Sequence, residues 1–389
     1  MVRPNASQHL MRWGFEAAFD AVSDRAPASN YHNADTNELL RRREAASFSE
    51  APDWGVERKR TQQVLYDAAL RAGAKIEFGR GIVDVSETAE GSSVTLTDGE
   101  VRYGDLILAT DGIRSRLRPQ IMRTVGLTDP GPSADGTTIF QVEIPVERVL
   151  SNPRTRYLGE TSDLMVWMGE GLWSYTLFNT KTRVFVGLFG MLKEDVSTSS
   201  TESGEGSKSL WTQEGDISHV RDRFKGTHHV LQELAALTTS CDRWRQAELP
   251  DLHQWISKHG RLALLGDSAH AMYPDAAQGF SQIVEDVACL DALLLRPSTV
   301  QTATAEWQKI RKPRAERVKA YAAANHQLYR LGGRAFPKQT SDSSNDQANK
   351  DGDQDAILVD ANAPFNTPAF TKWLYTYDVV KDASVGSDV

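Results

Sequence analysis

The sequence predicts an α/β fold in which two strand-to-helix units enclose an antiparallel sheet. Leu262–Leu265 is a short apolar run typical of a buried strand, Gly266-Asp267 ends it, and a helix begins at Gly279. Residues 105–118 repeat this order of buried strand, tight turn and helix start. Between the two units, residues 137–189 hold several short β-type runs separated by turns, which favours an antiparallel sheet.

Composition and charge narrow the class of protein. The chain has 389 residues, enough for two domains, and its 40% hydrophobic and 25% charged residues are ordinary for a globular protein. A formal net charge of −8 disfavours nucleic acid or an anionic membrane as partner. We find neither a membrane-length apolar run nor a signal-peptide pattern, so we expect a cytoplasmic protein.

Cysteine and histidine give no sign of a metal. Cys241 and Cys289 form no zinc-type spacing, and His228-His229 lacks an accompanying HExxH pattern or a nearby cysteine. Cys289 falls on the apolar side of the helix that begins at Gly279, which predicts a buried thiol. We therefore expect a metal-free protein.

The stretch 261–290 predicts a ligand site. The ionised Asp267 carboxylate only accepts hydrogen bonds, so at a strand end it suits the hydroxyls of a ligand. The helix that opens after Gln278-Gly279 presents free N–H groups and partial positive charge. We expect this helix to bury its apolar side chains and to keep Glu285 and Asp286 off that face; the apolar set is Phe280, Ile283, Val284, Val287 and Ala288.

A second turn has a similar form. Leu106–Ala109 is the predicted strand, Asp111-Gly112 the tight turn, and Ser115 the residue at which a helix begins. Taken alone, each turn is also compatible with a plain strand-to-helix connection, in this case with Ser115 as N-cap. The alternative for both is an ordinary α/β protein of another kind.

Together these residues resemble the single-component FAD-dependent aromatic hydroxylases, of the salicylate hydroxylase and para-hydroxybenzoate hydroxylase type. The resemblance rests on the pattern G-D-A-A-H, then P, Q-G and E-D on a helix, present here as Gly266-Asp267-Ser268-Ala269-His270, Pro274, Ala277-Gln278-Gly279 and Glu285-Asp286. Asp111-Gly112 resembles the D-G motif of the same family, with Thr110 where alanine is usual. The similarity extends from Val2 to Asp378, where Trp373-Leu374 and Asp378 resemble a W-L-x-x-x-D ending.

The resemblance implies an FAD site. Asp267, after Gly266, would hold the ribityl chain, and His270 would be structural. Pro274, Ala277 and the Gln278-Gly279 backbone would face the isoalloxazine ring, with Asp111 and Gly112 as secondary contacts. The family's reaction needs FAD, NAD(P)H as reductant, O2 and an aromatic or polyketide-like substrate, often in secondary metabolism. The alternative is a non-redox relative, a cyclase, isomerase or ligand-binding protein.

Arg58 and Gln62 lie in a weaker match. Residues 56–69 resemble the family's H-R-x-x-L helix start, in which Arg58 would be the flavin-proximal arginine and Gln62 would lie near the cofactor. Glu57 and Thr61 replace the histidine and leucine of that pattern. Because arginine-rich runs usually form solvated faces, a surface position for Arg58 is an equal alternative.

The family's first βαβ unit, with its G-x-G-x-x-G phosphate loop, has no counterpart in the sequence. Three glycine pairs, at 79 and 81, 169 and 171, and 204 and 206, lack the third glycine. The expected fold is therefore an N-terminally truncated, Rossmann-like three-layer FAD/NAD(P)-binding domain with an inserted antiparallel-sheet substrate domain. Either Met1 lies inside a longer enzyme, or the protein has lost tight FAD binding.

The remaining pattern suggests domain limits at residues 1–133, 134–256, 257–336 and 337–389, the first and third belonging to the FAD-binding domain. We expect strands at 74–85 and 93–97, a flexible loop at 195–216, helices at 217–239 and at 302–332 with a bend near Pro313, and a polar linker at 338–355. The tail at 373–378 is expected to pack on the body. Trp244, Trp255 and Tyr273 are aromatic candidates for a pocket or for the core.

Overall fold

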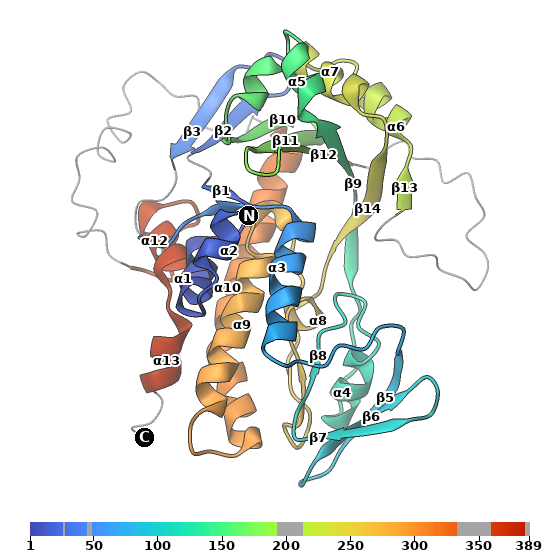
Figure 1. The fold of residues 1–389 in the computed structure, drawn as a ribbon, viewed down its shortest axis with the longest axis vertical. Helices are drawn as coiled ribbons and strands as arrows, with labels where there is room; N and C mark the ends of the chain where they lie inside the picture. Colours follow the sequence, from blue (N-terminus) through green and yellow to red (C-terminus); the bar gives the residue numbers. More distant parts are fainter. Residues whose placement is uncertain (26–27, 45–48, 193–212, 333–358, 386–389) are drawn as a thin grey trace.

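The molecule consists of a sheet layer above and a helical layer below, with a small α/β region at the base of the helices (Figure 1). A computed structural model describes residues 1–25, 28–44, 49–192, 213–332 and 359–385. The predicted loop at 195–216 lies mostly outside these residues, and the predicted linker at 338–355 lies wholly outside them.

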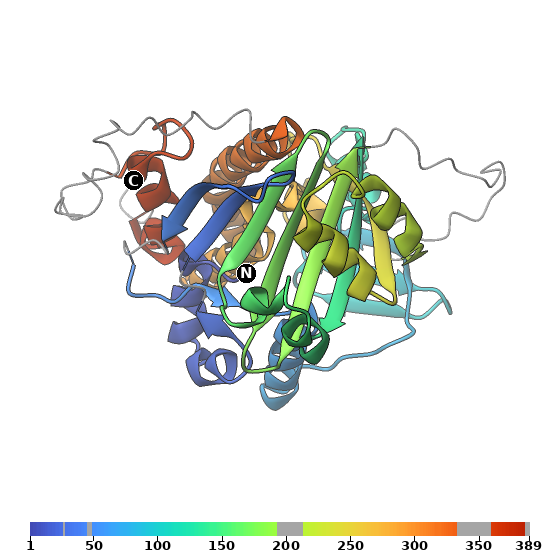
Figure 2. The same ribbon diagram turned by 90° about the horizontal axis from the view of Figure 1, so that it is seen from above.

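The upper layer is an eight-stranded mixed sheet with the order β13-β14-β9-β12-β11-β10-β2-β3. Strands β2 and β10 pair in parallel and the remaining neighbours pair antiparallel. Helices α5, α6 and α7 cover its outer face (Figures 1 and 2). The strands are β2 (Ala28–Asn33), β3 (Leu39–Glu44), β9 (Ser133–Pro145), β10 (Leu164–Gly169), β11 (Leu172–Asn179), β12 (Val184–Leu192), β13 (Gln213–Gly215) and β14 (Cys241–Glu248). The covering elements are α5 (Val146–Ser151), η1 (Arg156–Gly159), α6 (Ile217–Arg223) and α7 (His229–Leu237).

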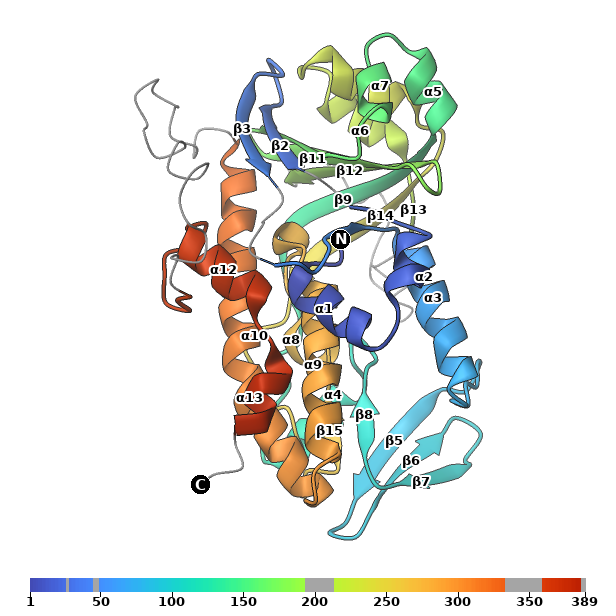
Figure 3. The ribbon, with the colours of Figure 1, turned by 60° about the vertical axis from the view of Figure 1, so that its left-hand side comes forward.

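The lower layer is built around two long helices, α9 and α10, which pack side by side (Figure 3). Helix α1 and the C-terminal helices pack against them, as predicted for the tail. The helices are α1 (Pro4–Arg12), α2 (Glu16–Asp20), α3 (Arg58–Arg71), α9 (Gly279–Leu294), α10 (Val300–Arg330), α12 (Pro368–Thr376) and α13 (Val379–Val385). Pro313 lies inside α10, which is assigned as one helix of 31 residues.

Short strands complete the lower layer. Strands β8 (Ile107–Ala109) and β15 (Leu262–Leu264) form a two-stranded parallel sheet, so the two predicted strand-to-helix units lie next to each other. A three-stranded antiparallel sheet follows, β5 (Ile82–Glu87), β6 (Ser92–Leu96) and β7 (Val101–Gly104), and β1 (Asp24–Arg25) pairs with β4 (Trp54–Gly55). The short helices are α4 (Arg118–Thr124), α8 (Asp267–His270) and η2 (Pro274–Ala276).

Two large hydrophobic cores stabilise the two layers. One surrounds β15 and includes Leu262, Leu264 and Trp307, which are fully buried. The other fills the space between the eight-stranded sheet and helices α6 and α7, with Phe140, Phe185 and Phe189 at its centre. Cys289 is fully buried in the first core, as predicted, and Cys241 is buried in the second. Trp255 also belongs to the first core.

The expected strand at 74–85 is only partly formed. Strand β5 begins at Ile82, and the residues before it have no strand conformation and are exposed. Ile76 is 39% and Phe78 is 78% exposed, so this apolar pair has no core to pack against among the described residues. A strand needs a hydrogen-bonded neighbour: the Gly81 carbonyl accepts a hydrogen bond from the Thr97 N–H, but none of the described segments pairs with residues 74–80.

The sheet differs from the expectation in one respect. Residues 28–44, which the sequence analysis assigned with the FAD-binding segment, form strands β2 and β3 and extend the sheet beyond β10. The register runs from Leu164 opposite Ser29 to Met168 opposite Asn33. The N-terminal segment therefore contributes to both layers of the molecule.

Candidate functional site

The two acidic turns converge, as the sequence predicted. Ala109 of β8 lies opposite Leu264 of β15, so both strands end at the same edge. The Ser268 hydroxyl joins the turns that follow: it accepts a hydrogen bond from the Gly112 N–H at 2.8 Å and donates one to Asp111 Oδ1 at 3.2 Å. One side chain thus fixes both turns relative to each other.

Asp111 shapes its own turn. Its Oδ2 accepts hydrogen bonds from the backbone N–H groups of Arg116, at 2.7 Å, and Leu117, at 3.2 Å. Ser115 does not begin the helix: α4 starts at Arg118, whose N–H donates to the Ser115 hydroxyl. The Gly112 φ of 82° keeps the turn tight, and a Cβ at this glycine would meet no atom within 4 Å.

Gly266 and Asp267 form the turn between β15 and α8. Gly266 has φ 64° and ψ −138°, and its N–H donates to Asp286 Oδ2 at 3.2 Å. Asp267 begins α8 and is exposed. Within the part of the chain that the structure describes, its carboxylate has no hydrogen-bond partner. An exposed acceptor-only group at the end of a buried strand is thus open to the hydroxyls of a ligand.

The loop from Pro274 to Gly279 leads into α9. Ala277 adopts a left-handed conformation with φ 51°, and Gly279 is the first residue of the helix. The Gln278 side chain is fully buried and exchanges hydrogen bonds with the Asn5 amide of α1, at 3.0 and 3.4 Å. Gln278 therefore offers only its backbone to a ligand, whereas a Cβ at Gly279 would face open space.

Arg58 and Gln62 belong to helix α3. Both are exposed on the first two turns of α3. The Arg58 guanidinium lies 5.9 Å from the ring centroid of Trp244, a residue of β14, so it reaches toward the sheet layer. The preceding Glu57 accepts a hydrogen bond from the Thr182 hydroxyl at 2.6 Å, which ties the start of α3 to the sheet.

Tyr175 of β11 connects Arg58 with the loop that leads to α9. Burial raises the pKa of the Tyr175 phenol, the nearby Asp275 carboxylate raises it further, and Arg58 acts in the opposite direction.

The interior of α9 contradicts the amphipathic pattern. Glu285 and Asp286 are fully buried, whereas Val287, expected on the apolar face, is 42% exposed. The fully buried Arg311 of α10 pairs with both carboxylates, Glu285 through Nη1 and Asp286 through Nε at 2.9 Å. Arg314 adds a second pair to Glu285, at 2.6 Å. Because two arginines of α10 pair with these carboxylates, the acidic side of α9 is buried in the interior.

The pKa values of both acids follow from this pairing. Burial would raise them, but Arg314 and Arg311 hold the pKa of Glu285 below its usual value, and His270 and Arg311 do the same for Asp286. His270 Nε2 lies 2.6 Å from Asp286 Oδ2. The His270 ring is therefore part of the structural network behind the turn, as expected.

One group near the loop was missed by the sequence analysis. His326 of α10 lies between Asp275, which directly follows Pro274, and Asp135 of β9. The partners are 51 and 191 residues away in the sequence, and no motif or spacing links them.

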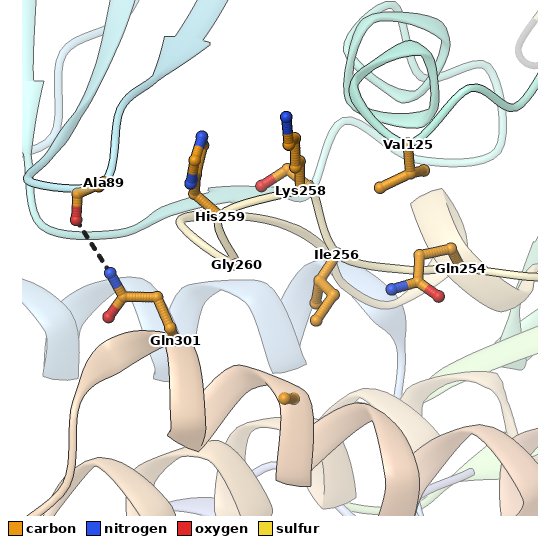
Figure 4. Close-up of a pocket in the computed structure, with 10 residues that line it drawn as sticks. Ala89, Val125, Gln254, Ile256, Lys258, His259, Gly260 and Gln301 are labelled. Carbon is orange, nitrogen blue, oxygen red and sulfur yellow. Dashed lines mark hydrogen bonds between the residues drawn. The ribbon is translucent and has the colours of Figure 1, made fainter.

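A pocket of about 440 Å³ lies elsewhere, at the base of the helical layer (Figure 4). Its lining includes Gln254, Lys258, His259 and Gln301, and Gln301 Nε2 donates to the Ala89 carbonyl at 3.0 Å. None of the predicted cofactor residues lines it. Across the described ranges, no group of three or more His, Cys, Asp or Glu side chains is arranged to hold a metal ion, and no helix is long and apolar enough to cross a membrane.

Comparison with known proteins shows which proteins the chain resembles. No family model matches the chain. An FAD-dependent monooxygenase, OpS4 of Beauveria bassiana, is 23% identical over 386 residues, covering 97% of this chain and 85% of the relative. A salicylate hydroxylase of Pseudomonas putida is 26% identical over 340 residues, covering 84% and 75%. Aurachin C monooxygenase/isomerase of Stigmatella aurantiaca is 29% identical over 300 residues, covering 72% and 65%.

Solved structures show the same fold. CtdE in complex with FAD and a substrate superimposes with a TM-score of 0.78 at 19% identity, covering 99% of this chain and 87% of the other. A salicylate hydroxylase substrate complex gives 0.76 at 20% identity, covering 100% and 90%. The fold is thus that of the flavoprotein hydroxylases. In sequence, the chain is similar to FAD-dependent monooxygenases, salicylate hydroxylase among them.

Proposed function

We propose that this chain acts as an FAD-dependent monooxygenase that hydroxylates an aromatic or polyketide-like small molecule, with NAD(P)H as reductant and O2 as the oxygen source. The observation that carries the proposal is the Asp267 carboxylate, which has no hydrogen-bond partner among the described residues and lies where Ser268 joins the two turns. The relatives named above are monooxygenases and hydroxylases, which supports the same class of reaction.

The residues present fit the ring and ribityl parts of FAD. Asp267 offers an acceptor for ribityl hydroxyls, and the backbone at Gly112 and Gly279 borders space in which a Cβ would meet no atom within 4 Å. The sequence contains no G-x-G-x-x-G loop, and we assign no residue of this chain to the pyrophosphate.

Each residue of the site would have a definite task. Asp267 would bind the ribityl chain, and the N–H groups at the start of α9 would stabilise negative charge on the ring. The backbone of Pro274, Ala277 and Gln278 would set the ring's position. Bound FAD would supply, after reduction, the reaction with O2 that delivers one oxygen atom to the substrate. The sheet and helical layers would keep water away from that step.

FAD binding tests the cofactor assignment. We expect the purified protein to quench FAD fluorescence on titration, and Asp267→Asn to weaken binding roughly 10-fold or more because a charged hydrogen-bond acceptor is lost. The thermal unfolding temperature of the variant should stay unchanged, since the Asp267 carboxylate has no partner among the described residues. The matched control is Asp291→Asn. Asp291 is exposed, like Asp267, but lies on α9, and this variant should bind FAD normally.

Turnover tests the reaction class. NAD(P)H oxidation should rise when an aromatic substrate is added, and the product should gain the mass of one oxygen atom. A stable, folded, colourless protein that binds an aromatic ligand without taking up flavin would instead support a cyclase, isomerase or binding protein.

A further inference from the structure

His326 of α10 joins the two layers at a single buried point. Its Nε2 lies 2.5 Å from Asp135 Oδ2 on β9, and its Nδ1 lies 2.8 Å from Asp275 Oδ2 in η2. The His326 side chain is fully buried, and that of Asp275 is 1% exposed. The ring stacks on Tyr273, with centroids 4.2 Å apart at 10°, and meets Trp173 of β11 edge-on.

With both carboxylates ionised, this geometry requires a charged ring. A neutral imidazole carries one N–H, so its other nitrogen would direct a lone pair at a carboxylate oxygen less than 3 Å away. Only the imidazolium donates from both nitrogens. Deprotonation of His326 therefore breaks one of the two hydrogen bonds and leaves two buried acceptors facing each other.

The bridge acts on the loop that the proposed function assigns to the flavin ring. Asp275 directly follows Pro274 and precedes Ala277 by two positions. Asn325, next to His326, donates to the Asp275 carbonyl at 3.2 Å, so α10 holds this residue through both its side chain and its backbone. Asp275 Oδ1 has no hydrogen-bond partner, so the anchor of this carboxylate among the described residues is His326.

We propose that His326 is a positioning residue, whose imidazolium fixes the loop 274–279 in its ring-binding conformation by tying Asp275 to Asp135. This role rests on the proposed function, because the loop 274–279 is where the flavin ring would bind. The tie itself is a property of the chain without FAD, which allows the two to be tested separately.

The surrounding charges favour the charged ring. Burial alone would lower the pKa of His326, but Asp135 and Asp275 outweigh burial and raise the pKa to about 9. Arg330 lies 3.5 Å from Asp135 and balances the second carboxylate. Three other titratable groups lie near the bridge, and burial raises the pKa of each: Glu248 of β14, Tyr273 and Tyr175.

The sign of the pH dependence follows. The folded pKa of about 9 exceeds the unfolded value of 6.5, so the tie contributes fully below about 6.5 and is lost as pH rises through about 9. We expect the loop to loosen in alkaline solution while the interior of α9 stays intact.

Histidine NMR and hydrogen exchange test the tie in protein without FAD. In ¹³C-histidine-labelled protein, the signal that disappears in His326→Gln should titrate near pH 9, and Asp135→Asn should move that midpoint to lower pH. At pH 7, peptides covering 272–279 should exchange roughly 10- to 100-fold faster in His326→Gln, the effect of losing one charged hydrogen bond. Peptides covering 287–294 of α9 should not change.

His253→Gln, at an exposed histidine, is the control and should alter neither measurement. A His326 midpoint at or below 6.5, or loop exchange that changes only in step with α9, would overturn the proposal. Should His326→Gln fail to fold, the histidine signal whose midpoint moves in Asp135→Asn is assigned to His326, and its midpoint in the unchanged protein decides between about 9 and 6.5. A protein with the predicted tie that takes up no FAD would contradict the proposed function and leave the tie standing.

Discussion

Gly266 occupies a backbone conformation that other residues rarely adopt, with φ 64° and ψ −138°. A Cβ there would lie 3.0 Å from Ile283 Cγ1, so a side chain would be both strained and crowded. We expect Gly266→Ala to lower the free energy of unfolding by about 1–3 kcal/mol, measured by urea denaturation. Gly279→Ala, in open space at the first position of α9, should cost almost nothing, and an equal loss in both would contradict this account.

Single residues also show what the sequence could reveal. Asp111 and Asp267 were identifiable because each follows a short apolar run, and parallel strands end at a common edge; of the two strands, β15 is buried throughout, whereas Leu108 of β8 is exposed. His326 was not identifiable, because its partners come from distant segments and meet only once β9, η2 and α10 pack together. A lone histidine in a long helix carries no local signal of two buried carboxylates.

Helix α9 and helix α10 form a charged interior that the helical pattern of α9 alone could not predict. Periodicity assigns charged positions to the solvent side, and this assignment fails when the facing helix supplies matching charges. Arg311 and Arg314 are such charges, and Val287 is exposed because Glu285 and Asp286 occupy the interior side. The position of helix α9 was thus predictable from the sequence, but the side that this helix buries was not.

Removal of one arginine tests this interior. Arg311→Met should cost about 3–5 kcal/mol of unfolding free energy at pH 7, since it removes the buried cation that Glu285 and Asp286 share and leaves them only Arg314 and His270 as ion-pair partners. The paired acids have lowered pKa values, so their contribution is present above their unfolded values of about 4 and is lost as pH falls through the folded ones. In the variant, both acids have lost one cationic partner and take up protons more readily, so the deficit in unfolding free energy should shrink between pH 7 and pH 5.

The matched control is Lys312→Met. Lys312 pairs with Glu316 on the surface of the same helix, with side chains 24% and 28% exposed. We expect its loss to cost less than about 1 kcal/mol in guanidinium denaturation. Equal costs for Arg311→Met and Lys312→Met would show that the pairs of α9 with α10 do not stabilise the fold.

The molecule as a whole depends on its C-terminal helices. Leu374 of α12 is fully buried, and its carbonyl accepts a hydrogen bond from Arg314 Nη2 at 2.9 Å. Leu374→Ala should therefore lower the free energy of unfolding by about 2–5 kcal/mol in a urea titration. Leu295→Ala, at a site 80% exposed, should change it by less than about 0.5 kcal/mol, and a similarly small effect at Leu374 would mean that the tail is dispensable.

The general architecture was predictable from two strong signals. One is the apolar alternation across residues 137–189, and the other is the strand-turn-helix order at residues 105–118 and 261–290. The assignment of residues 28–44 was not, because a parallel partner such as β10 leaves no mark in the local sequence of β2. The failed strand at 74–81 has the same origin, since alternation shows that a strand is possible but not that a neighbour is available.

Residues near the start of the chain find their partners only at great separation. Asn5 bonds Gln278 and Glu285, and Ser29 pairs across from Leu164. On a ribosome that adds roughly 5–20 residues per second, Asn5 must wait on the order of 15 s or longer before Gln278 exists. Nascent chains of this protein should thus spend that interval incompletely folded, which makes successful synthesis depend on chaperone capacity and on the speed of translation.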